Sequence, residues 1–267
     1  MKSFKIFILS LLLFLVPAAA FALRIDNPKV RIKVTTGQNY TGLITVENPT
    51  KDQVGVKVYL EDFIYVEPFD GDKKFMPRGT TPRTIADCIT FSPENFTLEP
   101  FGSKTVNFTI SPAKPFKETL CGVLFFETAM GSSMEEGKAI DVLGRLGSLI
   151  FVDPADGKKS AVFSSPEGGN RAISGTISNS GNLFLSAMGT FYVMDSSGNV
   201  LDRGQTAEAY LMPGDKRPLE IKFSPKLSEG SYTAVVTFDM QDNDMFTKEI
   251  DFSLSSTGEV KVAGSRD

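Results

Sequence analysis

The chain has 267 residues, a net charge of −4 and a hydrophobic fraction of 41%, which is an ordinary composition for a globular protein. Because it is weakly acidic and has no basic cluster, the composition argues against nucleic acid and anionic lipid as partners. The absence of histidine removes the commonest general base, the usual Ser–His and Cys–His pairs and histidine-ligated metal sites.

The N-terminus has the pattern of an export signal. Lys2 and Lys5 precede an apolar run over residues 6–16, and the small-residue sequence PAAAFA follows at positions 17–22. The apolar run is shorter than the roughly 20 residues that a membrane span needs. We therefore predict a cleaved signal peptide over residues 1–22, a periplasmic or extracellular location, and no membrane span in the mature chain. A retained signal anchor is the alternative.

The rest of the chain has the periodicity of β-strands. Apolar residues alternate at positions 96–98 and again at Val106, Phe108 and Ile110, with a Pro-Phe-Gly turn at 100–102 between the two runs. Such alternation is typical of antiparallel strands with one buried face. No segment combines a convincing helical period with capping residues. The sequence therefore predicts an all-β fold.

The length and the turn residues predict two domains. The sequence DPADGKK at positions 153–159 is the best candidate linker, and about 100 residues suffice for one Ig-like sandwich. We predict an Ig-like N-terminal domain over residues 23–153 and an Ig-like β-sandwich over residues 154–256. Residues 257–267 are expected to form a frayed polar tail.

Two cysteines, Cys88 and Cys121, lie in the predicted mature chain. An even number of cysteines in an exported protein suggests a disulfide. The chain-entropy model gives such a bond a stabilisation of about 3–4 kcal/mol. Two buried free thiols are the alternative.

The acidic residues do not form a recognisable site. They lie in loop-like segments, and the three aspartates near a predicted hairpin tip lack the glycine and the distal glutamate of an EF-hand loop. No G-x-S-x-G or P-loop motif occurs. We therefore predict no catalytic residue, no metal and no cofactor; a carboxylate-dependent enzyme is the minor alternative. The acidic groups considered are Glu135, Glu136, Asp70, Asp72, Asp239, Asp242 and Asp244.

One strand is a candidate recognition element. Residues 139–152 read AIDVLGRLGSLIFV, with apolar residues on both faces of an extended chain. That pattern fits either a fully buried strand or an edge strand that awaits a partner. Edge pairing gives affinity through main-chain hydrogen bonds and specificity through alternate side chains. The candidate partner-binding residues are Ile140, Val142, Leu146 and Arg145.

The first domain resembles the N-terminal Ig-like domain of pilus-type periplasmic chaperones. Gly37 after the first strand, Asn48 at the end of the next, and the sequences FSP at 91–93 and GVLFF at 122–126 carry the resemblance. It implies two tandem sandwiches, the first of which donates alternating apolar residues of its last strand to a subunit. Ile140 and Val142 occupy donor positions, and the next position holds Gly144.

The same resemblance implies an arginine and a lysine that anchor a subunit's C-terminal carboxylate. Counting along the chain places Ile32 at the arginine position, next to Arg31, and Leu149 at the lysine position. Arg145 is a candidate substitute. Both halves of the chain, through the GVLFF strand at 122–126 and the sequence NSGNL at 179–183, are also similar to Gram-positive cell-wall proteins that bind WxL-domain partners, without their C-terminal membrane span.

Together these patterns favour an exported, non-enzymatic protein that binds another envelope or surface protein by β-strand edge pairing. Its role would be that of a chaperone or adaptor, and a pilus-like subunit is one example of such a partner. A structural Ig-like surface module without chaperone activity is the alternative.

Overall fold

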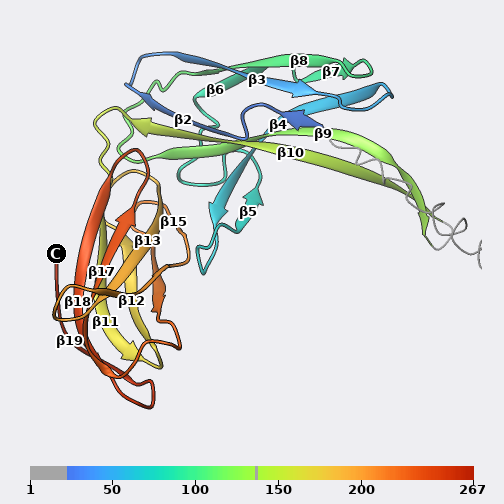
Figure 1. Cartoon of the computed structure of the whole chain (residues 1–267). Helices are drawn as coiled ribbons and strands as arrows, with labels where there is room; N and C mark the ends of the chain where they lie inside the picture. The colour runs from blue at the N-terminus through green and yellow to red at the C-terminus, as the bar shows by residue number, and fades with distance from the viewer. Residues whose placement is uncertain (1–22, 136–137) are drawn as a thin grey trace, which may run out of the picture.

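The computed structural model describes residues 23–135 and 138–267, except for the side chains of residues 132–140. The predicted signal peptide, residues 1–22, lies outside the described residues. The described chain contains strands and turns and no helix, so the all-β prediction is confirmed. Two β-sandwiches meet at a corner, which gives the molecule a bent shape (Figure 1).

The first sandwich consists of two sheets. One has the strand order β1-β3-β8-β6; the other has the order β2-β10-β9-β4-β5, with β7 also paired to β4. Strand β2 runs parallel to β10, and the other pairs are antiparallel. The bounds are β1 (Arg24–Ile25), β2 (Lys29–Val34), β3 (Tyr40–Glu47), β4 (Val54–Tyr65), β5 (Lys73–Met76), β6 (Ile89–Ser92), β7 (Asn95–Leu98), β8 (Ser103–Ile110), β9 (Leu120–Glu135) and β10 (Lys138–Pro154).

Alternating apolar residues form the core of this sandwich. Val106, Phe108 and Ile110 of β8 are all buried, as the period-two pattern predicts. Gly42 of β3 faces Phe108, and a Cβ at Gly42 would overlap the phenyl ring. The glycine therefore allows close contact between the ring and the neighbouring strand.

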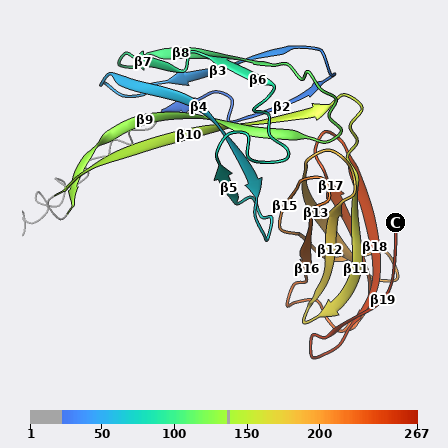
Figure 2. The ribbon, with the colours of Figure 1, turned by 180° about the vertical axis from the view of Figure 1, so that it is seen from behind.

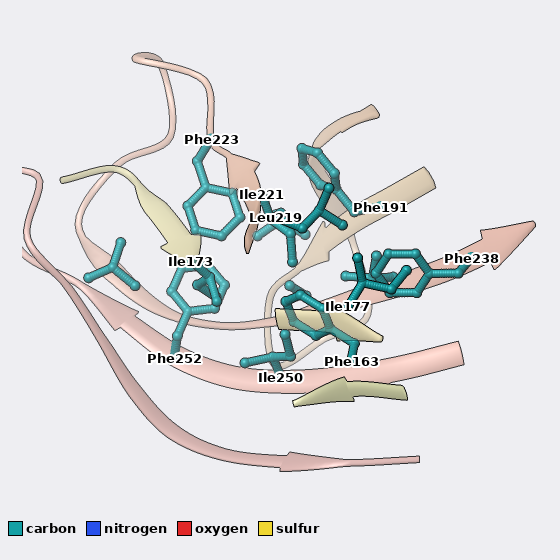
Figure 3. Close-up of a cluster of buried hydrophobic side chains, with 14 of the residues drawn as sticks. Phe163, Ile173, Ile177, Phe191, Leu219, Ile221, Phe223, Phe238, Ile250 and Phe252 are labelled. Carbon is teal, nitrogen blue, oxygen red and sulfur yellow. The ribbon is translucent and has the colours of Figure 1, made fainter. Parts of the chain in front are cut away.

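The second sandwich also has two sheets, with the orders β11-β12-β16 and β14-β13-β17-β18-β19, and β15 pairs with β13. Its core contains side chains from both sheets (Figure 3). The bounds are β11 (Ala161–Gly169), β12 (Ala172–Asn179), β13 (Leu185–Met194), β14 (Val200–Gln205), β15 (Ala209–Leu211), β16 (Lys216–Lys222), β17 (Gly230–Asp239), β18 (Met245–Leu254) and β19 (Val260–Arg266).

The C-terminal residues differ from the expected frayed tail. Residues 260–266 form β19, which pairs antiparallel with β18. Val260 is buried in the core of the second sandwich, and Val262 packs against that core. The prediction was wrong because β19, although mostly polar, pairs with β18 and has two valines in contact with the core.

An aromatic cluster joins the two sandwiches. Phe184 of the second sandwich stacks on Phe151 of β10, with ring centroids 4.6 Å apart, and on Tyr65 of β4 at 5.3 Å. The Phe184 amide donates a hydrogen bond to Thr119 Oγ1 at 2.8 Å, and the Thr119 amide donates to the Asn182 carbonyl at 3.1 Å. Buried rings and main-chain hydrogen bonds thus fix one sandwich against the other.

The two cysteines are free thiols, so the predicted disulfide is wrong. Cys121 lies in the aromatic cluster between the sandwiches, where its thiol is 3.9 Å from the Phe63 carbonyl. Cys88 packs against the core of the first sandwich, where its thiol donates to the Ile85 carbonyl at 3.3 Å. The side chains lie on opposite faces of the sheet that contains β9, so the sulfur atoms cannot meet.

Candidate functional site

Strands β9 and β10 continue beyond the first sandwich as a two-stranded arm, formed by residues 128–135 and 138–148. The arm projects away from the second sandwich in both views (Figures 1 and 2). Strand β4 pairs with β9 only as far as Glu127, and β2 pairs with β10 only over residues 149–154. Within the described ranges, therefore, neither outer edge of the arm has a strand partner.

The two halves of β10 have different environments. Ile150 and Val152 are fully buried between β2 and β9, as in an internal strand. Val142 and Leu143, in the outer half, are exposed. Of the two alternatives for residues 139–152, the buried strand describes the inner half of β10 and the edge strand describes the outer half. Only the outer half offers main-chain groups to another strand.

The predicted apolar binding residues lie along this outer half. The backbone of Ile140 pairs with Ser133, and the Ile140 side chain lies outside the described part of the structure. Val142 is opposite Gly131 and is 42% exposed. Leu146 is opposite Phe126 and half-buried against the core, so it marks the base of the arm.

Arg145 points to the other face of the arm. Its guanidinium lies 4.1 Å from the Phe125 ring centroid, 3.2 Å from Glu61 Oε1 and 3.4 Å from the Tyr59 hydroxyl. Burial raises the pKa of Tyr59, and Arg145 opposes that rise as a hydrogen-bond donor. Arg145 therefore connects the base of the arm to β4, and its side chain lies on the opposite face of β10 from that of Leu146.

Met130 is a residue of the arm that the sequence analysis missed. The register shifts between Val142, which is opposite Gly131, and Leu143, which is opposite Ala129, so Met130 lies in a β-bulge. A Cβ at Gly144 would overlap the Met130 sulfur, so the Met130 side chain covers Gly144. The signal in the sequence is Gly131, whose φ of 118° suits glycine, since a glycine within a strand pattern often marks a bulge.

A polar cluster around Arg31 lies where β2 meets the second sandwich. Ile32, at the expected arginine position, is buried in the core, whereas Arg31 lines a cavity of about 690 Å³ between the sandwiches. Arg31 Nε donates to Asp153 Oδ2 at 2.6 Å, and Nη2 donates to the Phe184 carbonyl at 2.9 Å. Its Nη1 atom is buried and has no hydrogen-bond partner among the described residues.

Other charges around this cavity hold the fold together. Lys29 lies 5.6 Å from the centroid of Phe184, and burial, followed by the nearby charge of Arg31, lowers its pKa. Lys159 Nζ lies 2.7 Å from Asp242 Oδ2 and donates to the Met240 carbonyl at the same distance. Leu149, at the expected lysine position, packs against the aromatic cluster instead.

The described aspartates at the turn between β17 and β18 have structural partners. Asp239 accepts a hydrogen bond from the Gln241 amide at 2.7 Å, and Asp242 pairs with Lys159, which are structural roles in a turn. Glu135 and Glu136 have no described side chain. In the described chain, no group of three or more acidic or cysteine residues is placed to hold a metal ion. No helix there is long and apolar enough to cross a membrane.

The comparisons with known proteins support the fold. No protein-family model matches the chain, and no curated protein matches it. A chain of the chaperone–tip adhesin complex of CFA/I fimbriae biogenesis is 14% identical, with a TM-score of 0.52, and the match covers 85% of this chain and 97% of that one. The class 5 fimbriae chaperone CfaA is 15% identical, with the same TM-score and the same coverage. The chain therefore has the fold of these fimbrial chaperones, two Ig-like β-sandwiches in tandem, as its sequence suggested.

Proposed function

We propose that this chain is an exported, non-enzymatic chaperone-like protein that binds a subunit of an envelope or surface structure, such as a pilus-like subunit. The observation that carries the proposal is the outer edge of β10 before Leu149, which faces away from β9 and has no strand partner among the described residues. A strand of the subunit pairs with this edge, and the interaction takes place in the periplasm or outside the cell. The fold shared with fimbrial chaperones supports the proposal.

The arm has the properties that strand addition requires. Its free edge supplies a row of main-chain donors and acceptors, which give affinity for any extended segment. Val142 adds an exposed apolar side chain beside that edge. A two-stranded ribbon is marginally stable alone, so an added strand, with its extra hydrogen bonds and buried area, stabilises both molecules.

Arg31 supports a second contact with the same partner. Arg31 lines the cavity, its Nη1 group is buried without a hydrogen-bond partner among the described residues, and a carboxylate is the acceptor that matches a guanidinium best. The C-terminal carboxylate of the partner fits this position. Extending the partner's C-terminus by three residues should then weaken binding, and an unchanged affinity would remove the Arg31 contact from the proposal.

The test of the proposal is a matched pair of substitutions. A photoreactive p-benzoylphenylalanine at Leu143, in the chain expressed in its source cell, identifies the protein at the arm. That protein is purified and titrated with wild type, Val142→Asp and Val162→Asp; Ile140→Asp is a companion. Val162 is a good control, because it is 47% exposed on a strand of the second sandwich, against 42% for Val142.

We expect Val142→Asp to weaken binding at least tenfold, because it places a carboxylate in an apolar contact, and Val162→Asp to bind like wild type. The absence of any crosslinked protein, or equal binding by the two variants, would refute strand addition at this edge. A crosslinked protein that is a permanent component of a finished assembly, and not an unassembled subunit, would favour the structural-module alternative.

A further inference from the structure

The geometry points to Met130 as the residue that supplies the apolar side chain missing at Gly144 of the binding strand. This inference rests on the proposed function and adds a specificity-determining residue from the neighbouring strand, β9. The partner that fits is a subunit with a β-sheet fold. Its apolar groove accepts an unbranched, flexible thioether between the contacts of Val142 and Leu146.

Three alternate positions of β10 form the row that would face the partner. Val142, Gly144 and Leu146 are alternate residues of β10, so they lie on one face at intervals of about 7 Å. Val142 and Leu146 carry apolar side chains, whereas Gly144 leaves the middle of the row without one.

The Met130 side chain fills this interruption in the row. A Cβ at Gly144 would overlap the Met130 sulfur and would lie 3.0 Å from its Cγ, so the Met130 side chain occupies the position above Gly144. The β-bulge directs Met130 there, because it places an extra residue of β9 opposite the Val142–Leu143 step.

The Met130 side chain is accessible to a partner. Met130 is 43% exposed, although it borders an apolar cavity of about 150 Å³ that Leu23, Phe126 and Leu146 also line. Its side chain therefore has an anchored stem and a surface that a partner can cover. Methionine adapts to irregular apolar surfaces better than a branched residue, which suits a binding row completed from a second strand.

The experiment moves the side chain from β9 to β10. Met130→Ala removes it, and Met130→Ala with Gly144→Val restores an apolar side chain from β10 itself. The backbone of Gly144 is outside the left-handed region, so valine can occupy it without strain. Met245→Ala is the control, because Met245 is 62% exposed on the second sandwich. The probe is the purified protein crosslinked through position 143.

We expect Met130→Ala to weaken binding about tenfold, the double variant to recover to within about threefold of wild type, and Met245→Ala to have no effect. Thermal unfolding monitored by circular dichroism shows whether each variant is folded. If Met130→Ala binds like wild type while Val142→Asp does not, the inference about Met130 is wrong and strand addition stands. If the double variant is folded and shows no recovery, Met130 does not supply the missing side chain. If Val142→Asp also binds like wild type, both proposals fail.

Discussion

The packing of Phe184 predicts a large loss of stability on truncation to alanine. The ring is 0% exposed and stacks between Phe151 and Tyr65, with centroid distances of 4.6 Å and 5.3 Å. A buried Phe→Ala substitution costs about 3–5 kcal/mol, from lost transfer free energy and the cavity left behind. Because two stacked partners also lose their contacts, we expect Phe184→Ala to lie in the upper half of that range.

Urea unfolding at equilibrium measures this cost, and Phe101→Ala is the matched control. Phe101 is 74% exposed, so the same chemical change should alter the free energy of unfolding by less than about 0.5 kcal/mol. Small-angle scattering of the folded Phe184→Ala variant should also show a larger radius of gyration, because the contact between the sandwiches is weakened. A cost below about 1 kcal/mol with unchanged scattering would show that the aromatic cluster does not fix the two sandwiches.

Three further outcomes follow from other contacts. Unfolding under non-reducing conditions should expose two reactive thiols, and fewer than two would contradict free cysteines. In the folded protein, burial raises the pKa of Cys121 to about 12, so this thiol should stay unreactive at pH 8. Burial also raises the pKa of Cys88, which should react slowly. Truncation after residue 259 removes β19 and the buried Val260, and urea unfolding should show a loss of about 2 kcal/mol or more. Lys159 lowers the pKa of Asp242 below 3.8, so this pair stabilises the fold above pH 3.8 and its contribution is lost as the pH falls through the lowered pKa. The difference in unfolding free energy between wild type and Asp242→Asn should shrink over that acid range, and a constant difference would refute the assignment.

Local periodicity predicted much of the first sandwich. The alternation at Val106, Phe108 and Ile110 gave both the strand and its buried face, because side chains in a strand alternate strictly between two faces. The apolar residues on both faces of residues 139–152 fitted either a buried strand or an edge strand, and the inner half of this segment is buried on two surfaces. One surface is the core of the first sandwich, and the other is the aromatic cluster against the second sandwich.

The remaining features depend on contacts between distant segments. Counting cysteines could not show that Cys88 and Cys121 lie on opposite faces of one sheet. The pairing of β19 depends on main-chain hydrogen bonds, which a polar sequence does not reveal. The aromatic contact of Phe151 with Phe184 joins residues of different sandwiches. The sequence pattern around one of these residues does not show that the other is its partner.

The candidate site was predictable only in part for the same reason. Val142 was identified because its own strand pattern is apolar. Whether its edge is free depends on β2 pairing with β10 only from Leu149 onward, a difference in strand length that no single pattern encodes. Met130 depends on the register of β9 against β10, which a bulge shifts.

Under the proposed function, one strand serves both stability and binding. The inner half of β10 is held by β2 on one edge, by β9 on the other, and by the stacking of Phe151 on Phe184. The direction of the outer half is set at its base, because it continues a strand that β2 and β9 already hold there. Phe184→Ala should therefore weaken partner binding less than Val142→Asp: the first substitution alters the support of the arm, and the second alters the surface that the partner covers. If Phe184→Ala remained folded and abolished binding, the cleft between the sandwiches, and not the arm, would be the principal contact.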